Sequence, residues 1–300
     1  MIEEKLTVLQ RAAAAYSPVA FTRADLISAG MSSRAIASAV RGGHLVHVRR
    51  DRYVLPSATE DVAEAVRIGG RLTCLSLLAS MGVFVHRGTG LHIAIARNSC
   101  RLRRPRVHPV TRHWNTASGE AAPIHVAPLI DAVRHAMRCQ TPRAAVATLD
   151  SLRHERLLTA EQLQHVFDGL PARFRPILVL VDGSAGSGPE TFVRLMLRAI
   201  GVVYETQVFI DRVGYVDFLV DGWLIIECDS KEFHEGWAKQ KQDRARDLEA
   251  ARQGYVTVRP MAADILGDPA AVQQMLREII EALGPRVSAA RRSQFSQNMR

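Results

Sequence analysis

Acidic side chains interrupt apolar segments in the C-terminal third of the chain, and their types and spacing could support metal chemistry. Asp217 lies inside the segment 215–220, and Glu227 follows the apolar run 223–226, with Asp229 two residues further on. Buried carboxylates need a cation, a hydrogen-bond network or a proton to offset the loss of water. Three converging carboxylates with access to water would form a hard-cation site, and Mg²⁺ is bound by few carboxylates together with water and phosphate.

Whether these carboxylates converge depends on the turn between the two apolar segments. A two-residue loop at 221–222 pairs Asp217 with Ile226 and places Glu227 on the far face of the hairpin. A three-residue loop at 220–222, with the glycine as a bulge, pairs Asp217 with Ile225 and brings all three acids to one face. We favour the three-residue loop, because isolated carboxylates bring no benefit to a strand with a buried pattern.

Turn signals and apolar periodicity predict the elements that position these acids. A helix begins at Ser187 and Pro189, carries Glu190 in its first turn and ends before Gly201. Its apolar residues recur at helical spacing, which predicts one buried face. Alternating apolar segments and glycine stops predict the elements that follow, which are strands at 206–210, 215–220 and 223–228, a helix at 238–252 and a strand at 255–259.

Taken in order, the polar residues of this region resemble a known nuclease family. The residues that carry the resemblance are Glu190, Asp217, Glu227-Cys228-Asp229, His234, Asp243, Arg246-Asp247 and the segment 254–259. They resemble the Vsr-like branch of the PD-(D/E)xK nucleases, which includes the very-short-patch mismatch repair endonuclease. The resemblance spans about residues 187–265. It implies a restriction-endonuclease-like domain that hydrolyses phosphodiester bonds with Mg²⁺ or Mn²⁺.

The resemblance also implies a role for each matching residue. Asp217 and Glu227 would hold the metal, and Glu190 would reach it through water. His234 would transfer a proton, while Lys231 or Arg246 would offset the charge that develops on the phosphate.

Three positions depart from the general pattern of the family. Asp229 stands where many of these nucleases have lysine, as in this branch generally, and it completes the catalytic set. Ser230 replaces the usual glycine and Cys228 an aliphatic residue. The serine could alter the turn after the strand and therefore the activity.

Residues 2–56 predict a DNA-binding module. Helices are expected at 6–16, 22–30 and 33–41, followed by a hairpin whose turn is 49–52. This is the order of a winged helix-turn-helix, in which a helix and the hairpin meet DNA. The arginines at these two places are Arg34, Arg41, Arg49, Arg50 and Arg52. The alternative is a small helical module that packs on a partner.

Residues 3–56 also resemble the N-terminal winged-helix domain of AbiEi-type antitoxins, and the segments 74–83, 91–98 and 129–138 resemble its usual continuation. This domain recurs in front of unrelated C-terminal partners, so the likeness does not imply antitoxin activity. The middle region contains an acid-free strip at 97–113 that could contact phosphates or be a solvated loop. Its candidate DNA-binding arginines are Arg101, Arg103, Arg104 and Arg106.

Composition narrows the class of protein further. The chain has 300 residues and a formal charge of +9, which favours a polyanionic partner. No run of 18 apolar residues and no signal peptide is found, so we expect no membrane segment. The four cysteines (Cys74, Cys100, Cys139 and Cys228) contain no C-x-x-C pair, and they predict neither a zinc site nor a disulfide framework. We expect a cytoplasmic protein with reduced thiols.

Together these patterns predict an α/β (α+β) protein. The expected parts are a winged helix-turn-helix at 1–58, a mixed α/β middle domain at 59–182, a Vsr-like nuclease domain at 183–284 and a flexible basic tail at 285–300. The expected function is a metal-dependent DNA endonuclease in DNA repair or phage defence. The alternative is an antitoxin-type transcriptional regulator with an inactive nuclease-like domain. DNA is the expected partner, no membrane is involved, and a homo-oligomer is left open.

Overall fold

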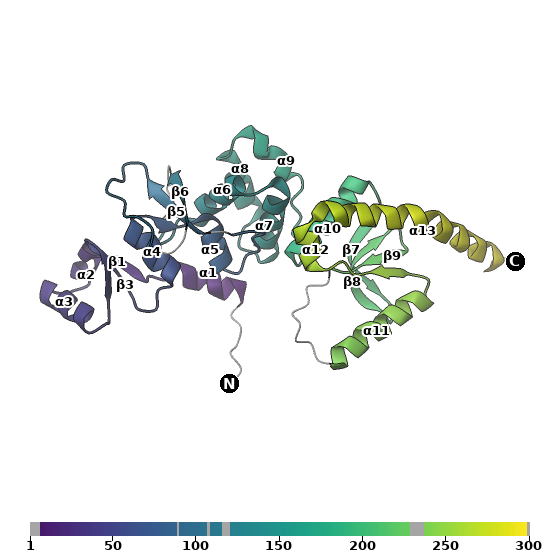
Figure 1. The fold of residues 1–300 in the computed structure, drawn as a ribbon, viewed down its shortest axis with the longest axis horizontal. Helices are drawn as coiled ribbons and strands as arrows, with labels where there is room; N and C mark the ends of the chain where they lie inside the picture. Colours follow the sequence, from purple (N-terminus) through teal and green to yellow (C-terminus); the bar gives the residue numbers. More distant parts are fainter. Residues whose placement is uncertain (1–6, 89, 107–108, 116–120, 229–236, 299–300) are drawn as a thin grey trace. The chain divides into compact units, whose positions relative to one another are not determined.

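The computed structural model describes residues 7–298 apart from 89, 107–108, 116–120 and 229–236 (Figure 1). Helices alternate with three small sheets, so the expected α/β class is confirmed. The chain folds into two units, residues 1–181 and 182–300.

The first unit begins with a small helical module. Its elements are α1 (Val8–Tyr16), β1 (Ala20–Thr22), α2 (Arg23–Ser28), α3 (Ser33–Arg41), β2 (Val46–Arg49) and β3 (Arg52–Val54). The three strands form an antiparallel sheet in the order β1-β3-β2. Thr22 and Asp25 form the expected capping box at the start of α2, and Leu26 and Ile36 pack with Leu45 under the hairpin. Helix α1 instead contacts the middle region, where the Tyr16 hydroxyl donates to the carbonyl of Ala127.

The middle region builds a second sheet covered by helices. Its elements are α4 (Glu60–Ile68), β4 (Arg71–Leu72), α5 (Cys74–Ser80), β5 (Leu91–Ala96), β6 (Val110–Asn115), α6 (Leu129–Cys139), α7 (Pro142–His154), α8 (Ala160–Asp168), η1 (Ala172–Phe174) and α9 (Arg175–Leu178). Strand β5 is central, antiparallel to β4 and parallel to β6. Strand β5 is almost entirely buried, because helices pack against this small sheet.

The second unit is a four-stranded sheet with helices on both faces. Its elements are α10 (Gly188–Ile200), β7 (Tyr204–Ile210), β8 (Gly214–Val220), β9 (Leu224–Ile226), α11 (Trp237–Arg252), β10 (Val256–Val258), α12 (Ala262–Gly267) and α13 (Pro269–Asn298). Strands β7, β8 and β9 form an antiparallel meander, and β10 pairs parallel with β9. Helix α10 packs with α12 and α13, and α11 lies on the other side of the sheet (Figure 1). There Ala250 of α11 packs on Val216 and Ile225.

The turn between β8 and β9 differs from the loop we favoured. Val220 pairs with Leu224, so the three loop residues are 221–223 rather than 220–222. Asp221 and Gly222 both have positive φ, at 48° and 71°, which lets the chain reverse before Trp223. Continued by one residue beyond the last pair, this register sets Asp217 opposite Glu227. The two acids therefore share a side of the hairpin, although through a different turn.

The C-terminal segment also differs from expectation. Helix α13 continues through the segment expected as a flexible tail and ends at Asn298. The sequence after Pro285 contains neither glycine nor proline, and it includes four arginines, two alanines and two glutamines. These residues favour helix, so nothing in the segment ends α13 earlier.

Candidate functional site

Two of the predicted acids are joined through one glutamine side chain. Glu190 lies in the first turn of α10, whose N-cap residue is Ser187. Its Oε2 atom accepts hydrogen bonds from the backbone N–H of Gly186 at 2.9 Å and from Nε2 of Gln207 at 3.1 Å. The same Gln207 nitrogen donates to Oδ1 of Asp217 at 3.4 Å. Glu190 and Asp217 therefore lie side by side, with Gln207 between them.

The backbone at this point is irregular. Gln207 has φ of 52° within β7, and the regular pairing of β7 with β8 skips it between Thr206 and Val208. Positive φ is uncommon for residues other than glycine and tends to occur at functional sites. On the other side of Asp217, its Oδ2 atom accepts from the backbone N–H of Cys228 at 2.8 Å. These two donors fix the orientation of the aspartate carboxylate.

The third acid, Glu227, is held by two arginines. Arg246 of α11 donates to its Oε1 at 3.2 Å, and Arg259 donates to its Oε2 at 3.1 Å. Arg259 also donates to Asp247 at 2.8 Å, and Arg246 donates to two backbone carbonyls of the β7–β8 hairpin region. Arg246, expected to face a phosphate, thus uses its Nε and Nη2 groups within the protein.

Burial makes the carboxyl groups of Glu190 and Glu227 harder to ionise. The pKa of Glu190 is raised, first by burial and then by the negative charge of Asp217. Burial also raises the pKa of Glu227, although Arg259 and Arg246 act in the opposite direction. The pKa of the buried Cys228 thiol is raised by desolvation and by the neighbouring acids. A cation between Glu190 and Asp217 would relieve this unfavourable charge.

Part of the predicted site lies outside the described residues, namely Asp229, Ser230, Lys231 and His234. In the part of the chain that is described, Glu190, Asp217 and Glu227 do not form a group whose ligand atoms are all close enough to hold one metal ion. Glu227 is turned toward its arginines instead. The pair of Glu190 and Asp217 is the portion of the predicted site that the fold assembles.

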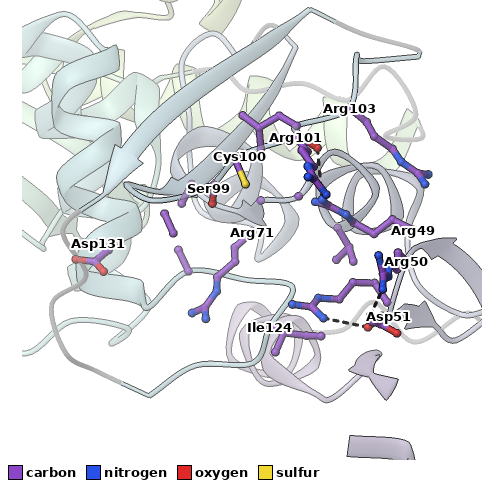
Figure 2. A pocket seen from close by; sticks show the side chains of 18 of the residues that line it. Arg49, Arg50, Asp51, Arg71, Ser99, Cys100, Arg101, Arg103, Ile124 and Asp131 are labelled. Carbon is purple, nitrogen blue, oxygen red and sulfur yellow. Dashed lines mark hydrogen bonds and ion pairs between the residues drawn. The ribbon is translucent and has the colours of Figure 1, made fainter. Parts of the chain in front are cut away.

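A basic pocket of about 690 Å³ lies between the hairpin of the first module and the middle region (Figure 2). Six arginines line it, together with the acids Asp51 and Asp131. The arginines are Arg49, Arg50, Arg52, Arg71, Arg101 and Arg103. The pocket therefore joins two basic segments that are separated in the sequence.

Some of these arginines also hold the pocket together. Arg49 donates to the carbonyls of Ile68 and Arg101, and Arg103 donates to the carbonyl of Val48 at 2.8 Å. These bonds fasten the hairpin to the strip. Four predicted DNA-binding arginines, Arg34, Arg41, Arg104 and Arg106, are exposed and do not line the pocket.

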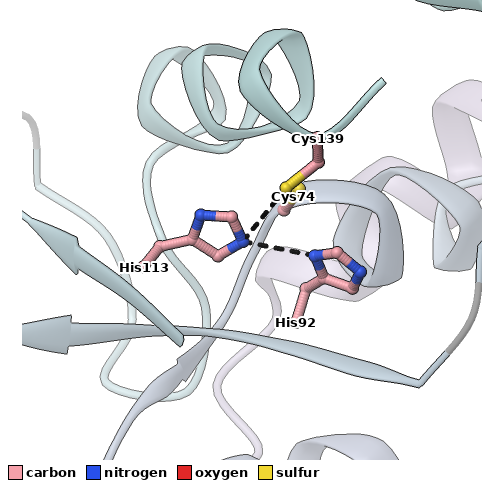
Figure 3. Close-up of side chains that lie close together, drawn as sticks. All are labelled: Cys74, His92, His113 and Cys139. Atoms are coloured by element: carbon pink, nitrogen blue, oxygen red, sulfur yellow. Dashed lines mark hydrogen bonds between the residues drawn. The ribbon is translucent and has the colours of Figure 1, made fainter. Parts of the chain in front are cut away.

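A group of cysteines and histidines forms a further site in the middle region (Figure 3). The Sγ atoms of Cys74 and Cys139 and a ring nitrogen of His92 and of His113 all lie within 4.8 Å of one another. Such a group could hold a metal ion, although the spacing of the cysteines along the chain predicted no zinc site. The ligands come from four separate elements, and the local spacing that signals zinc sites is absent.

The surroundings of this group are also polar. The ring of His135 stacks on His113 with a centroid distance of 4.4 Å, and its Nδ1 atom lies 2.9 Å from Thr73 Oγ1. Burial, followed by the nearby His113, lowers the pKa of His135 to about 4. His135 is therefore neutral at physiological pH and can stack on His113 without charge repulsion.

No family model matches the chain, and a search of curated proteins also finds no match. Within the described residues, no helix has the length and apolar character needed to span a bilayer.

Proposed function

We propose that the chain is a metal-dependent DNA endonuclease in which the second unit hydrolyses the phosphodiester bond and the first unit holds the DNA backbone. The observation that carries this proposal is the pair of Glu190 and Asp217 joined by Gln207. Glu190 is half-buried beside Asp217 and its pKa is raised, which is unfavourable for folding alone, and a cation between the two carboxylates would compensate for this cost.

The residues present fit a hard cation. Asp217 and Glu190 offer carboxylate oxygens, which are the ligands that Mg²⁺ and Mn²⁺ prefer. When bound, the metal would polarise the phosphate and lower the pKa of a water molecule. Glu227 would remain with Arg246 and Arg259, and would act by orienting these two guanidinium groups.

Residues of the chain itself would orient the carboxylates, transfer the proton and face the phosphate. Gln207 fixes the orientation of both carboxylates from its irregular position in β7. His234 as the proton-transfer group, and Lys231 as a cation facing the phosphate, stay predictions that the family resemblance implies. The order of α10, the β7–β9 meander, α11 and β10 is the order of elements that the sequence patterns predicted.

The basic pocket supports DNA as the substrate. Guanidinium groups match phosphate oxygens in geometry, and six of them surround this pocket. Arg34 and Arg41 on α3 are exposed and would reach the DNA beside the hairpin. DNA repair or phage defence are the processes in which such an enzyme would act.

One observation favours the alternative of a DNA-binding regulator with an inactive nuclease-like domain. Glu227 already has two arginine partners, so it does not need a metal. Under this alternative, the acidic pair would be a remnant, and DNA binding by the first unit would be the whole function.

The test is incubation of the purified chain with supercoiled, mismatched and single-stranded DNA, and with RNA, in Mg²⁺ or Mn²⁺. We expect cutting of DNA that the Asp217→Asn variant loses while it keeps DNA affinity. The matched control is Asp211→Asn, since Asp211 is 85% exposed in the turn before β8. Cutting of RNA alone would change the substrate class. Binding without cutting would support the regulator, and neither binding nor cutting would refute both proposals.

A further inference from the structure

We propose that Cys74, His92, His113 and Cys139 bind one structural Zn²⁺ in the middle region of the first unit. Figure 3 shows their side chains converging from the sheet and from two helices. None of the four belongs to the carboxylate site or lines the basic pocket. The zinc site therefore stands or falls independently of the proposed nuclease activity.

The separations of the ligand atoms are close to those of a tetrahedral site. His92 Nδ1 and His113 Nε2 lie 3.2 Å apart, and His113 Nε2 lies 3.9 Å from Cys139 Sγ. Zinc bonds of about 2.3 Å to sulfur and about 2.0–2.1 Å to nitrogen separate neighbouring ligand atoms by roughly 3.3–3.8 Å. Small side-chain rotations bring the whole group, already within 4.8 Å, to that geometry.

The arrangement of the nitrogens favours a metal over simple hydrogen bonding. His113 Nε2 faces both His92 Nδ1 and Cys139 Sγ. A hydrogen bond between two imidazole nitrogens requires a proton on one of them, and that proton serves a single partner. A metal ion accepts the lone pairs of all these atoms at once, so it accounts for their convergence on one point.

The types of donor select zinc among the common ions. Two thiolates and two imidazoles form a set of two sulfur and two nitrogen ligands, which in tetrahedral geometry is typical of zinc. Mg²⁺ and Ca²⁺ prefer oxygen ligands, and this group contains no carboxylate. Four protein ligands also leave no open position for substrate or water, and this is the mark of a structural site.

Strand pairing and helix ends hold the ligands in place. Thr73 donates its backbone N–H to the carbonyl of His92 at 3.1 Å, which sets Cys74 beside β5. The parallel register of β5 and β6 pairs Ala94 with His113. His92 lies two residues before Ala94 and therefore on the same face of β5, so His92 and His113 are neighbours. Cys139 is the last residue of α6.

Two further features belong to a site of this kind. Cys74 has φ of 54°, a sparsely populated conformation for a residue with a side chain, and it is retained where the surroundings require it. His135 stacks on His113 and is itself bonded to Thr73, so the orientation of the His113 ring is fixed from outside the group. The metal would join α5, β5, β6 and α6, next to a sheet whose first strand, β4, has only two residues.

The experiment measures zinc and cobalt on the full chain, purified with a reductant. We expect one zinc per chain by elemental analysis. Replacement by Co²⁺ should give thiolate-to-metal charge transfer in the near ultraviolet and the strong visible bands of tetrahedral cobalt. Cys139→Ser removes an exposed thiol, so it should fold normally, lose about half of the charge-transfer intensity and release zinc far more readily to a chelator.

Two variants serve as matched controls, and His113→Asn is a second test of the site. Cys100→Ser removes the other exposed thiol, and His154→Asn removes an exposed histidine of α7; both should leave zinc content and the cobalt spectrum unchanged. His113→Asn should weaken zinc binding. The proposal is overturned if the wild-type chain gives no thiolate–cobalt charge transfer, if Cys100→Ser weakens binding as much as Cys139→Ser, or if a Cys74–Cys139 disulfide is found in place of the metal.

Discussion

Replacing Glu190 by glutamine should stabilise the fold while abolishing its proposed activity. The variant Glu190→Gln keeps the size of the side chain and an oxygen that can accept from Gly186 and Gln207. It removes a half-buried negative charge that lies close to Asp217. The hydrogen bonds limit the distance between the two carboxylates. One nitrogen of Gln207 contacts an oxygen of each, at 3.1 and 3.4 Å, so these two oxygens are at most 3.1 + 3.4 = 6.5 Å apart.

Coulomb's law converts this bound into an energy. At 6.5 Å, two like charges repel by about 0.6 kcal/mol in water and by about 2.6 kcal/mol at an effective dielectric constant of 20. Because Glu190 is only half-buried, solvent screening brings the expected gain to about 1 kcal/mol. For a unit of this size, that gain corresponds to a rise of about 3–5 °C in Tm.

The gain should depend on pH in a defined direction. The pKa of Glu190 is higher in the folded protein than in the unfolded chain, so the folded state binds more protons between the two values. The wild-type chain therefore loses stability as the pH rises through this window, and it regains stability below the usual glutamate pKa. Since glutamine does not titrate, the advantage of the variant should be present at neutral pH and vanish near pH ~4.

The assay follows the thermal unfolding transition of the second unit from pH ~4 to 8 without divalent cations. The cutting assay is run on the same proteins. Glu205→Gln is the control, because Glu205 is an exposed glutamate on β7. Mg²⁺ should raise the Tm of the wild-type chain and have little effect on Glu190→Gln, since a ligand that binds only the folded state stabilises it. A variant that is less stable at neutral pH, or a gain that does not change with pH, would contradict the electrostatic argument.

Three further predictions concern Arg259, the N-cap of α10 and the arginines of the basic pocket. Arg259→Met should lower the free energy of unfolding by about 2 kcal/mol in denaturant titrations, because it leaves Glu227 with one partner in a site where both side chains are mostly buried; unchanged stability would show that Arg246 alone suffices. Ser187→Ala should cost about 1 kcal/mol through loss of the N-cap of α10, measured in the same way, and Ser187→Asp should restore it. Replacing Arg50 and Arg101 by glutamine should weaken DNA binding and reduce the slope of log K against log[salt] by about two; Arg212→Gln, an exposed arginine of the second unit, is the control, and an unchanged slope would mean that the basic pocket does not contact phosphates.

Much of the fold follows from local signals in the sequence. The caps at Thr22 and Ser32 and the stop at Gly201 predict helices that the structure contains within a few residues. The strand segments of the second unit are also present, because alternating apolar patterns against a helical layer leave few alternatives. What local signals could not give is register. We favoured a β8–β9 loop at 220–222 because it brings the three acids to one face, yet pairing in the assembled sheet places the loop at 221–223.

The candidate sites were likewise predictable only in part from the sequence. Asp217 could be selected because an acid inside an apolar segment is costly, and Glu190 because of the family resemblance. Their bridge by Gln207 depends on the positive φ of this residue within β7, which no sequence pattern predicts. The arginines of the hairpin and of segment 97–113 were predicted as contacts for DNA, whereas Arg49 and Arg103 donate hydrogen bonds to backbone carbonyls of the protein. Long-range contacts decide which groups remain free for a ligand.

The two metal proposals also affect how an activity assay has to be interpreted. Inhibition by EDTA would ordinarily support a Mg²⁺-dependent reaction, but a chelator would also remove zinc from the Cys74–Cys139 site. Loss of zinc would loosen β4–β6 of the first unit, and DNA binding through the basic pocket would weaken with it. The two effects separate through their donor chemistry. Mg²⁺ added back restores an oxygen-ligand site and cannot replace zinc at sulfur. Recovery with Mg²⁺ alone would therefore locate the EDTA effect at Glu190 and Asp217, and recovery that also requires Zn²⁺ would locate part of it in the first unit.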